Sequence, residues 1–395
     1  MDLGQLRDHR VGVLASGGLS ATAIGAWLAE NGVDTVSYVA DIGQNVPFSP
    51  TDLVELLEKH GQTSRVVDLR HEMAETYLDL LRYQATYEGG YWNTTGVSRK
   101  SLVAGLAEEL RADGRTILVH GCVGGGNDQA RFARYTAALA PDLTVFTPWT
   151  RPWLLEHFPN RQSMTDYLLA LGYPPVFADY TDYSVDGNLG GYSHESGDLE
   201  SLHTPSTSVS PILTNWPQQA PDNTETFRVR FVGARPVEVN GQAVDPVGAI
   251  ALANEAGGRN GISIRSVVEN RVNGTKCRGV YEAPGLEVLG QCLAALYQVS
   301  LDKQSTELAR TLFQQLGKAT YEGRLFEPAA LAARGAADLL TERATGTVEV
   351  NLYKGNVIFN GVTDLIELPG TARQTRFTNG GHAWHIEPSA QPANT

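Results

Sequence analysis

The chain has 395 residues, and its 31 Lys and Arg against 44 Asp and Glu give a formal net charge of −13. A charge of this sign repels a phosphate backbone, so we do not expect nucleic acid as a partner. No stretch reaches the ~18 consecutive apolar residues of a membrane helix, and the first residues lack the apolar segment of a signal peptide. The expected protein is therefore cytoplasmic and independent of membranes, with two or three cores at about 150 residues each.

The three cysteines, Cys122, Cys277 and Cys292, are widely separated in the sequence. Their spacing matches no metal-ligand pattern, and an odd number is typical of a reducing compartment. The sequence therefore predicts no disulfide framework, and no set of side chains can be named as metal ligands.

The N-terminal part alternates between apolar strands and helices. Residues 11–15 form an apolar run, followed by a Ser-Gly-Gly turn, a helix to about Glu30 and a second apolar run over residues 36–40. Residues 116–121 repeat the pattern after a helical stretch over residues 101–110. Continuous apolar strands that alternate with helices predict a parallel sheet covered by helices.

The pattern changes after about residue 175. Residues 181–219 are polar and without sustained periodicity, which predicts a loop-dominated stretch that carries binding residues or joins domains. Phe227, Val229 and Phe231 then alternate with arginines, and Asn240-Gly241 separates two β-rich runs. This is a strong hairpin signal, so we expect antiparallel strands to begin here.

Helices and a second hairpin follow in the C-terminal part. Asp245-Pro246 predicts an N-cap with proline at the first helical position, and a helix runs on to Glu255. Further helices are expected near residues 286–299 and 303–317. Residues 348–352 and 357–359 alternate on either side of Lys354-Gly355, which predicts a hairpin, and the last residues form a tail of undetermined order.

The first turn carries a candidate site for an anion. Ser16, Gly17 and Gly18 lie between a buried strand and a helix, where glycines let backbone N–H groups approach a phosphate at the helix N-terminus. No Gly-Lys-Ser/Thr follows, and G-x-G-x-x-G is absent, so neither common nucleotide motif is present. Taken alone, such a turn is more often a packing device.

A second glycine-rich segment supports the ligand interpretation. Residues 124–126 are three glycines that follow a predicted parallel strand, at the edge where open α/β sheets bind ligands. Asn127, Asp128 and Arg131 then bring an amide, a carboxylate and a guanidinium into one helical turn, which suits the ammonium and carboxylate of an amino acid. The alternative is an ordinary polar helix start, with Asp128 interacting with the helix dipole.

With these motifs in view, the sequence resembles the argininosuccinate synthases, in order and over nearly the whole chain. The matching segments are Ser16-Gly17-Gly18-Leu19, residues 40–44, Gly124, residues 126–129, Arg131-Phe132, Pro148-Trp149, residues 184–189, residues 268–271 and residues 278–282. The resemblance implies an α/β fold: an N-terminal parallel-sheet nucleotide-binding domain of the pyrophosphatase-loop type, an α+β synthetase domain, and assembly as a tetramer. We place these domains at residues 1–172 and 173–365, with a C-terminal tail over 366–395.

The resemblance also implies a reaction and a set of site residues. The ureido oxygen of citrulline attacks the α-phosphorus of ATP, pyrophosphate leaves, and the amine of aspartate then displaces AMP. ATP with Mg²⁺ would contact Ser16, Gly17, Gly18, Ser20, Thr22, Ala40, Gly121 and Gly124. The amino-acid substrates would face Tyr91, Thr95, Arg99, Val123, Asn127, Asp128, Arg131, Ser184, Ser193, Glu269 and Tyr281, with catalytic roles for Ser16, Asp128 and Arg131.

Each match has a plainer alternative. Tyr91 and Tyr281 could be half-buried aromatic residues whose hydroxyls have hydrogen-bond partners. Ser184 and Ser193 could be ordinary loop residues, and Glu269 a charged residue on the surface of a strand. Their joint occurrence in family order favours the site interpretation.

Several positions depart from the family pattern. The phosphate loop has Ser20 and Ala21 where the family has Asp and Thr, which leaves only weak Mg²⁺ ligation. Val123 replaces a threonine and Gly125 a lysine where the amine is held; at about 1–3 kcal/mol per lost contact, aspartate would bind tens- to thousands-fold more weakly. The remaining departures are Ala15 for tyrosine, Gly96 for serine and Lys100 for proline.

Three functional hypotheses follow. The first is a specialised ATP-dependent C–N ligase that adenylates citrulline or a ureido or carbonyl analogue and accepts an amine other than aspartate. The second is an authentic argininosuccinate synthase of arginine biosynthesis, and the third is a non-catalytic ligand-binding homologue. The expected partners are small amino-acid substrates and further copies of the chain, although residues 371–395 have poor helical character where the family has a long clasping helix.

Overall fold

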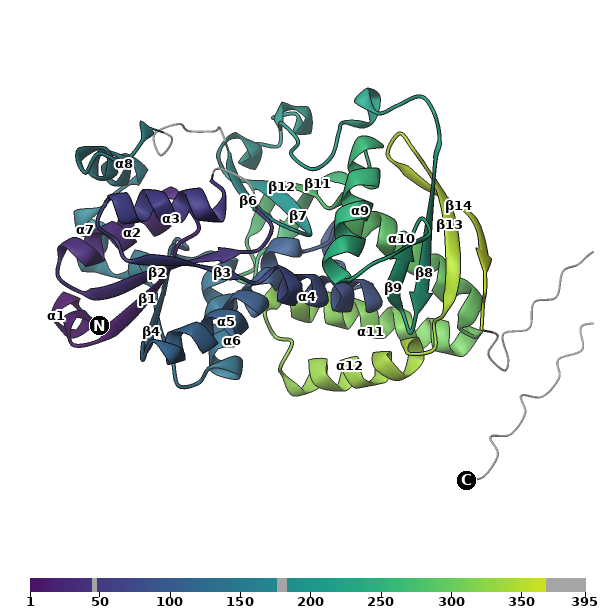
Figure 1. The fold of residues 1–395 in the computed structure, drawn as a ribbon, viewed down its shortest axis with the longest axis horizontal. Helices are drawn as coiled ribbons and strands as arrows, with labels where there is room; N and C mark the ends of the chain where they lie inside the picture. Colours follow the sequence, from purple (N-terminus) through teal and green to yellow (C-terminus); the bar gives the residue numbers. More distant parts are fainter. Residues whose placement is uncertain (45–47, 176–182, 367–395) are drawn as a thin grey trace, which may run out of the picture.

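A parallel sheet forms the framework of the N-terminal part of the computed structural model, which describes residues 1–44, 48–175 and 183–366 (Figure 1). Its five strands lie in the order β3-β2-β1-β4-β5. They are β1 (Arg10–Leu14), β2 (Asp34–Asp41), β3 (Ser64–Asp68), β4 (Ile117–His120) and β5 (Thr144–Phe146). Strand order reverses between β1 and β4, so the loops that follow these two strands flank the crevice where such sheets bind ligands.

Helices cover both faces of this sheet. They are α1 (Leu3–Arg7), α2 (Leu19–Glu30), α3 (Pro50–Lys59), α4 (Arg70–Arg82), α5 (Thr94–Ala112), α6 (Asn127–Leu139), α7 (Pro152–His157) and α8 (Arg161–Ala170). Alternate residues of the strands point to opposite faces. Val11 and Val13 therefore share a core with α2, α3 and α8, whereas Tyr38 and Leu118 pack with α4, α5 and α6.

Two antiparallel sheets form the second part. One has the order β10-β9-β8-β13-β14 and the other β11-β12-β7-β6. The strands are β6 (Ser184–Asn188), β7 (Gly191–Glu195), β8 (Glu225–Val232), β9 (Arg235–Val239), β10 (Gln242–Ala243), β11 (Ile264–Asn270), β12 (Lys276–Glu282), β13 (Gly346–Tyr353) and β14 (Asn356–Thr363). The helices are α9 (Pro246–Arg259), α10 (Pro284–Ser300), α11 (Lys303–Glu322) and α12 (Pro328–Thr341).

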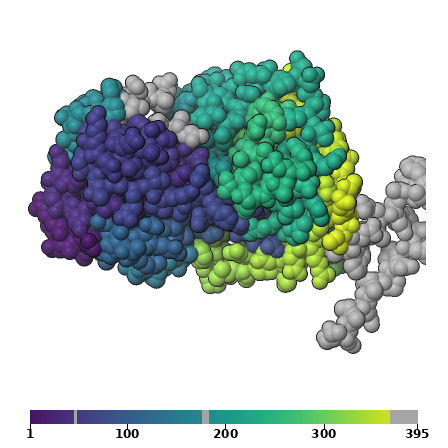
Figure 2. Space-filling model, viewed as in Figure 1, coloured from purple at the N-terminus to yellow at the C-terminus, as the bar shows by residue number. Residues whose placement is uncertain are grey.

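One hydrophobic core joins the two parts. It runs from α4 and α5 through α10 to the buried faces of β8 and β13, where Phe227 and Val348 have no exposed surface. The loop after β2 also contacts the β6–β7 turn, since the Leu189 amide donates to the Ile42 carbonyl at 2.7 Å. Figure 2 shows the purple and blue N-terminal residues in direct contact with the green C-terminal ones.

The α/β fold class expected from the sequence is confirmed, and local turn chemistry explains much of it. Asn240-Gly241 and Lys354-Gly355 have φ values of 50° and 83°, and of 43° and 84°. Two consecutive positive φ angles define the type I′ turn that matches strand twist. Asp245 caps α9 by accepting from the Gly248 amide at 2.7 Å, and the helix continues past the expected Glu255 to Arg259.

The expectation that antiparallel strands begin near Phe227 is wrong, because β6 and β7 already form a hairpin within the polar stretch. Its turn is closed by Asn188, whose side-chain oxygen accepts from the Gly190 and Gly191 amides at 2.9 and 3.2 Å. A Cβ on Gly187 would lie 2.1 Å from the Tyr192 ring, so the strands approach closely only with glycine there. Polar residues form this hairpin, which hides it from an apolar-periodicity criterion.

Two further observations complete the fold. Within the described ranges, no helix is both long and apolar enough to cross a membrane. The tail expected over residues 366–395 lies outside the described residues from 367 onward. The division at residues 172 and 173 stays a prediction.

Candidate active site

The turn after β1 presents unpaired backbone amides. Gly17 has φ +76°, and Gly18 is the N-cap of α2 without a side-chain cap. Thr22 donates the first backbone bond of the helix, to the Gly18 carbonyl at 3.0 Å, so the amides ahead of it have no partner inside the helix. With no acidic residue in the first turn of α2, this end of the helix favours an anion.

The side chains of this turn have different surroundings. Ser16 is exposed and Ser20 partly exposed, so both hydroxyls are accessible to a ligand. Thr22 is buried, and its hydroxyl donates to the Gly18 carbonyl at 3.0 Å. Thr22 thus stabilises the turn, and its contact with ATP stays a prediction.

The loop after β4 packs directly against this turn. A Cβ on Gly121 would lie 2.6 Å from the Ala21 amide nitrogen, and one on Gly124 would lie 2.9 Å from the Trp149 carbonyl oxygen. Only glycine allows both approaches. Ala40, on the other side of β1, is buried, and its carbonyl accepts from the Gln44 side chain at 2.7 Å. The two predicted nucleotide loops therefore meet at the switch point of the sheet.

A carboxylate between two guanidinium groups lies at the start of α6. Asp128 accepts from Arg99 at 2.9 Å and from Arg131 at 2.8 Å, and both arginine side chains are at least nine-tenths buried. Arg99 also pairs with Asp186 at 2.5 Å. Burial alone would raise the pKa of Asp128, but the two guanidinium groups lower it to about 2. Asp128 is therefore ionised at neutral pH.

The β11-β12-β7-β6 sheet directs a set of polar residues to one face. Ser184 pairs with Glu195, Asp186 with Ser193, Ser193 with Tyr281, and Glu195 with Gly279. Residues that are directly opposite share a face, as do residues two apart on one strand. The residues on this face include Ser184, Asp186, Ser193, Glu195, Arg265, Val267, Glu269, Cys277, Gly279 and Tyr281. The register alone thus gathers residues that are up to 97 positions apart, from Ser184 to Tyr281.

Tyrosines surround the buried carboxylate of Glu269. The Tyr91 hydroxyl donates to one of its oxygens, and the Tyr321 hydroxyl donates to the other at 2.6 Å. The Tyr91 ring stacks on Tyr281 with centroids 4.0 Å apart. The Tyr281 hydroxyl is buried and has no hydrogen-bond partner among the described residues. A buried hydroxyl without a partner is costly, so the Tyr281 hydroxyl is free to bond to a ligand atom.

Asn127, Arg131 and Tyr321 connect this cluster to α6. Asn127 donates to the Tyr321 hydroxyl at 2.8 Å and accepts from the Val272 amide at 2.9 Å. Arg131 donates through Nε to the Tyr321 carbonyl at 2.8 Å and through Nη1 to Asp128. Its Nη2 has no hydrogen bond among the residues described, which leaves one donor group for a carboxylate.

The Glu195 carboxyl group on this face has a strongly raised pKa. Burial raises it to about 7, with Glu269 and Asp128 adding to the effect and Arg131 opposing it. Within the described part of the chain, the Glu195 carboxylate has neither an ion pair nor a hydrogen bond. A carboxyl group poised near neutral pH is suited to proton transfer.

The remaining predicted residues lie at the edges of the site. The Thr95 and Ser193 hydroxyls are 2.8 Å apart, and the Ser184 hydroxyl donates to the Glu195 carbonyl at 2.9 Å. Val123 is 58% exposed. Gly125 has φ +76° with open space where a Cβ would point, so this loop presents no cation or donor side chain.

The replacement of a family serine by Gly96 has a local explanation. Asn93 caps α5 by accepting from the Gly96 amide at 3.0 Å. A Cβ at position 96 would lie 2.3 to 2.7 Å from the Asn93 amide group. A side chain at position 96 would therefore displace the Asn93 side chain from its present position.

The sequence analysis missed three residues of the site: Asp186, Glu195 and Tyr321. Asp186 lies within a matching segment, and Glu195 follows Ser193 at the two-residue spacing of a strand face, which could have signalled both. Tyr321 had no signal, because it lies beyond the expected helix end at residue 317 and α11 continues to Glu322. Among the described residues, no group of three or more His, Cys, Asp or Glu is arranged to hold a metal ion.

Comparison with known proteins gives a consistent match along the chain. Residues 10–173 match the family model of the arginosuccinate synthase N-terminal HUP domain, and residues 183–369 match that of the arginosuccinate synthase C-terminal domain. The chain is 36% identical over 358 residues to the argininosuccinate synthase of Carboxydothermus hydrogenoformans, covering 90% of this chain and 88% of the relative. It is 37% identical over 349 residues to that of Idiomarina loihiensis, covering 87% and 84%.

Proposed function

The chain belongs to the argininosuccinate synthase family of ATP-dependent ligases, and from that premise we propose that it joins citrulline to aspartate with ATP, forming argininosuccinate. The ureido oxygen bonds to the α-phosphorus and pyrophosphate leaves with its bonding electrons. The aspartate amine then attacks the ureido carbon and loses a proton, and AMP departs with the former ureido oxygen. The relatives' shared name favours this proposal over a ligase that uses a different amine.

The proposed ATP contacts are based on the two glycine-rich loops at the switch point of the parallel sheet. ATP phosphates would accept from the amides of Gly17, Gly18 and the start of α2, with Ser16 and Ser20 hydroxyls beside them. The close approach of Gly121 to Ala21 supports this, because it leaves backbone rather than side chains around the turn. Mg²⁺ would be held chiefly by the phosphates and water, since Ser20 offers only a hydroxyl. When bound, the ion would offset the charge on the leaving pyrophosphate.

The acceptor end rests on the polar sheet face, and the orphan Tyr281 hydroxyl is the single observation that carries the proposal. Tyr91, Glu269 and Tyr281 would contact the amino-acid backbone of citrulline, with the Nη2 group of Arg131 on its carboxylate and Ser193 beside its chain. Glu269 is suited to an ammonium, because it is buried, ionisable and already held in place by two hydroxyls. A zwitterion of fixed length would thus be oriented with its ureido group toward the nucleotide loops.

The amine end rests on Asp128 and Glu195. Asp128 is held ionised by Arg99 and Arg131, so it can accept hydrogen bonds from the ammonium of aspartate throughout the neutral range. Glu195 would take the proton that the amine loses on attack, because its pKa lies at about 7. The two carboxyl groups would divide binding and proton transfer between them.

A second candidate keeps the adenylation step and changes the amine. The observation that favours it is local: Val123 is 58% exposed and Gly125 offers no side chain, where the family pattern has a hydroxyl and an ammonium. The binding of a less polar amine would be weakened less by the missing side-chain contacts at this loop than the binding of aspartate.

Mass spectrometry of the reaction products distinguishes these possibilities. Purified protein is given ATP, Mg²⁺ and citrulline, with aspartate or with a panel of other amines at equal concentration. Argininosuccinate together with equimolar AMP and pyrophosphate is the expected result. A coupled adduct with another amine but not with aspartate would establish the second candidate. AMP from no combination would contradict both and favour a non-catalytic binding protein.

We also propose that the protein assembles as a homo-oligomer. Strand β14 is a sheet edge with Ile358 and Phe359 exposed by 48% and 50%, and apolar edges of this kind are usually covered by pairing. Light scattering tests this: a tetramer is expected, and a monomer at all concentrations would contradict it.

A further inference from the structure

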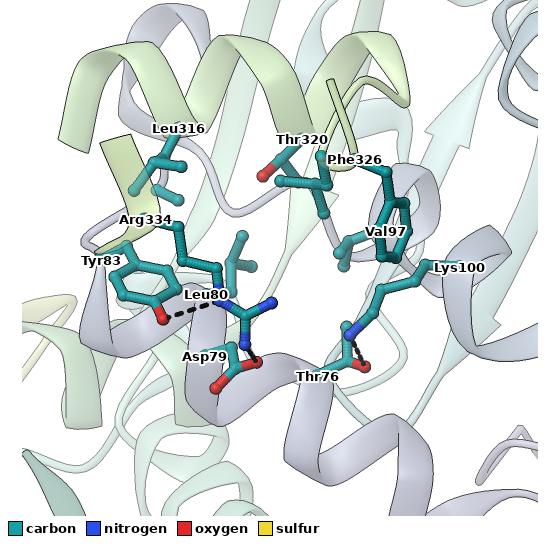
Figure 3. Close-up of a pocket in the computed structure, with 12 residues that line it drawn as sticks. Thr76, Asp79, Leu80, Tyr83, Val97, Lys100, Leu316, Thr320, Phe326 and Arg334 are labelled. Atoms are coloured by element: carbon teal, nitrogen blue, oxygen red, sulfur yellow. Dashed lines mark hydrogen bonds and ion pairs between the residues drawn. The ribbon is translucent and has the colours of Figure 1, made fainter. Parts of the chain in front are cut away.

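A partly enclosed cavity lies away from the candidate active site, between α4, α5, α11 and α12 (Figure 3). Apolar side chains form most of its wall: Leu80, Ala85, Val97, Leu316, Leu325 and Phe326. Lys100, Arg334, Asp79 and three hydroxyl-bearing residues supply its polar groups. The cavity is narrow, which limits an occupant to a few heavy atoms.

Among the described residues, Lys100 is the cation of this cavity that has no charge partner. Its ammonium donates to the Thr76 hydroxyl at 3.2 Å and forms no ion pair with any described residue. The nearest carboxylates are already used: Arg235 pairs with Glu75 and also with Asp79 at 3.1 Å, and Arg334 contacts Asp79 at 3.4 Å. Burial lowers the pKa of Lys100, with Arg334 adding to this and Asp79 and Glu75 opposing it. An unpaired ammonium in such surroundings is costly and is stabilised by an anion.

The cavity is separate from the active site although the two share helices. On α5, Arg99 contacts Asp128 and Asp186, whereas its neighbour Lys100 faces the cavity. On α11, Tyr321 contacts Glu269, whereas its neighbour Thr320 lines the cavity. Consecutive helical residues point in directions about 100° apart, which follows from 3.6 residues per turn.

We propose that this cavity is a binding site for a small monocarboxylate, with Lys100 as its charge partner and the apolar wall around its alkyl part. One uncompensated positive charge matches one negative charge, so a dianion such as sulfate would bring an excess charge into an apolar enclosure. Leucine, valine and phenylalanine side chains favour a short alkyl group over a bare halide. The Thr76 hydroxyl accepts from Lys100 and is also bonded to the Ser101 hydroxyl at 2.8 Å, so the remaining N–H groups of the Lys100 ammonium are the donors for the carboxylate.

Propionate is the probe for the test, and thermal unfolding at constant ionic strength is the measurement. A ligand that binds only the native state raises the unfolding midpoint in a saturable manner. Propionamide has the same shape as propionate without the charge, and sulfate is a dianion without an alkyl group. All titrations are made with citrulline and aspartate at saturation, so that carboxylate-binding groups of the active site are occupied.

Two variants decide whether Lys100 is responsible. Lys100→Met removes the ammonium and keeps a flexible stem, and Lys303→Met removes an ammonium that is 90% exposed on α11. We expect propionate to raise the unfolding midpoint of the wild type and of Lys303→Met in a saturable manner. In Lys100→Met the apparent binding of propionate should be at least tenfold weaker. Lys100→Gln serves the same purpose if the methionine variant does not fold.

Three results would overturn the proposal: equal propionate responses in Lys100→Met and the wild type, an equal response to propionamide, or no saturable response at all. The titration needs no turnover. It can therefore fail while the proposed ligase activity stands, or succeed on a protein that makes no argininosuccinate.

Discussion

Replacement of Glu195 by glutamine tests the proton-transfer role through stability and activity together. The carboxylate on β7 has no ion pair or hydrogen bond with any residue that the structure describes, and burial with the nearby Glu269 and Asp128 charges raises its pKa to about 7. Glutamine keeps the size and removes the charge. We therefore expect Glu195→Gln to be more stable than the wild type at alkaline pH and much less active.

The size of the stability change follows from the pKa. The folded value of about 7 against the ordinary 4.5 differs by 7 − 4.5 = 2.5, and at about 1.36 kcal/mol per pKa step this gives about 3 kcal/mol. Since the folded state holds the proton more tightly, the native protein loses this stability as pH rises from about 4.5 through about 7. The free energy of unfolding of Glu195→Gln should exceed that of the wild type by about 3 kcal/mol at pH 8 and by about zero at pH 4.

Urea unfolding at both pH values measures the gain, and Glu156→Gln is the control. Glu156 is exposed and forms no ion pair within the described residues, so its replacement should change stability little. In the activity assay, loss of a general base should lower kcat by about 100-fold or more. The wild-type rate should fall below about pH 7 as Glu195 takes a proton, and the variant should lack this acidic limb.

The proton-transfer reasoning fails if Glu195→Gln is no more stable than the wild type at pH 8. It also fails if the gain is the same at pH 4, because an uncharged packing effect would then explain it. Retention of the acidic limb in the variant would assign the titration to another group.

Three further substitutions test separate parts of the site. Tyr281→Phe removes the orphan hydroxyl, so stability should hold or rise by about 1 kcal/mol in thermal unfolding while the KM for citrulline increases about tenfold; an unchanged KM would mean that no substrate atom meets this hydroxyl. Gly121→Ala introduces a Cβ 2.6 Å from the Ala21 amide nitrogen. This clash should lower the free energy of unfolding by about 1–3 kcal/mol and raise the KM for ATP. Gly335→Ala is the control, because a Cβ there meets open space, and it should have neither effect. Asp128→Asn removes the negative charge between two buried guanidinium groups. The free energy of unfolding should therefore fall by about 3 kcal/mol, and most of kcat should be lost. Near-normal kinetics with aspartate would contradict the role of this carboxylate.

The elements that the sequence predicted well have local signals. The strand, glycine turn and helix over residues 10–30 follow from a short apolar run and a pair of glycines. The Asn240-Gly241 and Lys354-Gly355 hairpins follow from residues that tolerate positive φ, and α9 begins where Asp245 and Pro246 predict a cap. In each case the determining residues lie within a few positions of one another.

The parts that were missed depend on contacts between distant residues. The β6–β7 hairpin is polar because its face forms the site, so the same side chains that indicate function hide the strand pattern. Glu195 acquires its raised pKa first from burial and then from the charges of Glu269 and Asp128, which lie 74 and 67 positions away in the sequence. Tyr321 reaches the site only because α11 continues beyond the apolar periodicity that marked its expected end.

The most direct test of the central claim follows the ureido oxygen. Citrulline labelled with ¹⁸O at the ureido position is incubated with the protein, ATP, Mg²⁺ and aspartate, and the nucleotide product is analysed by mass spectrometry. If that oxygen attacks the α-phosphorus, AMP will carry one ¹⁸O atom for each argininosuccinate formed, and pyrophosphate will carry none. Unlabelled AMP, or label in the pyrophosphate, would contradict adenylation of the acceptor.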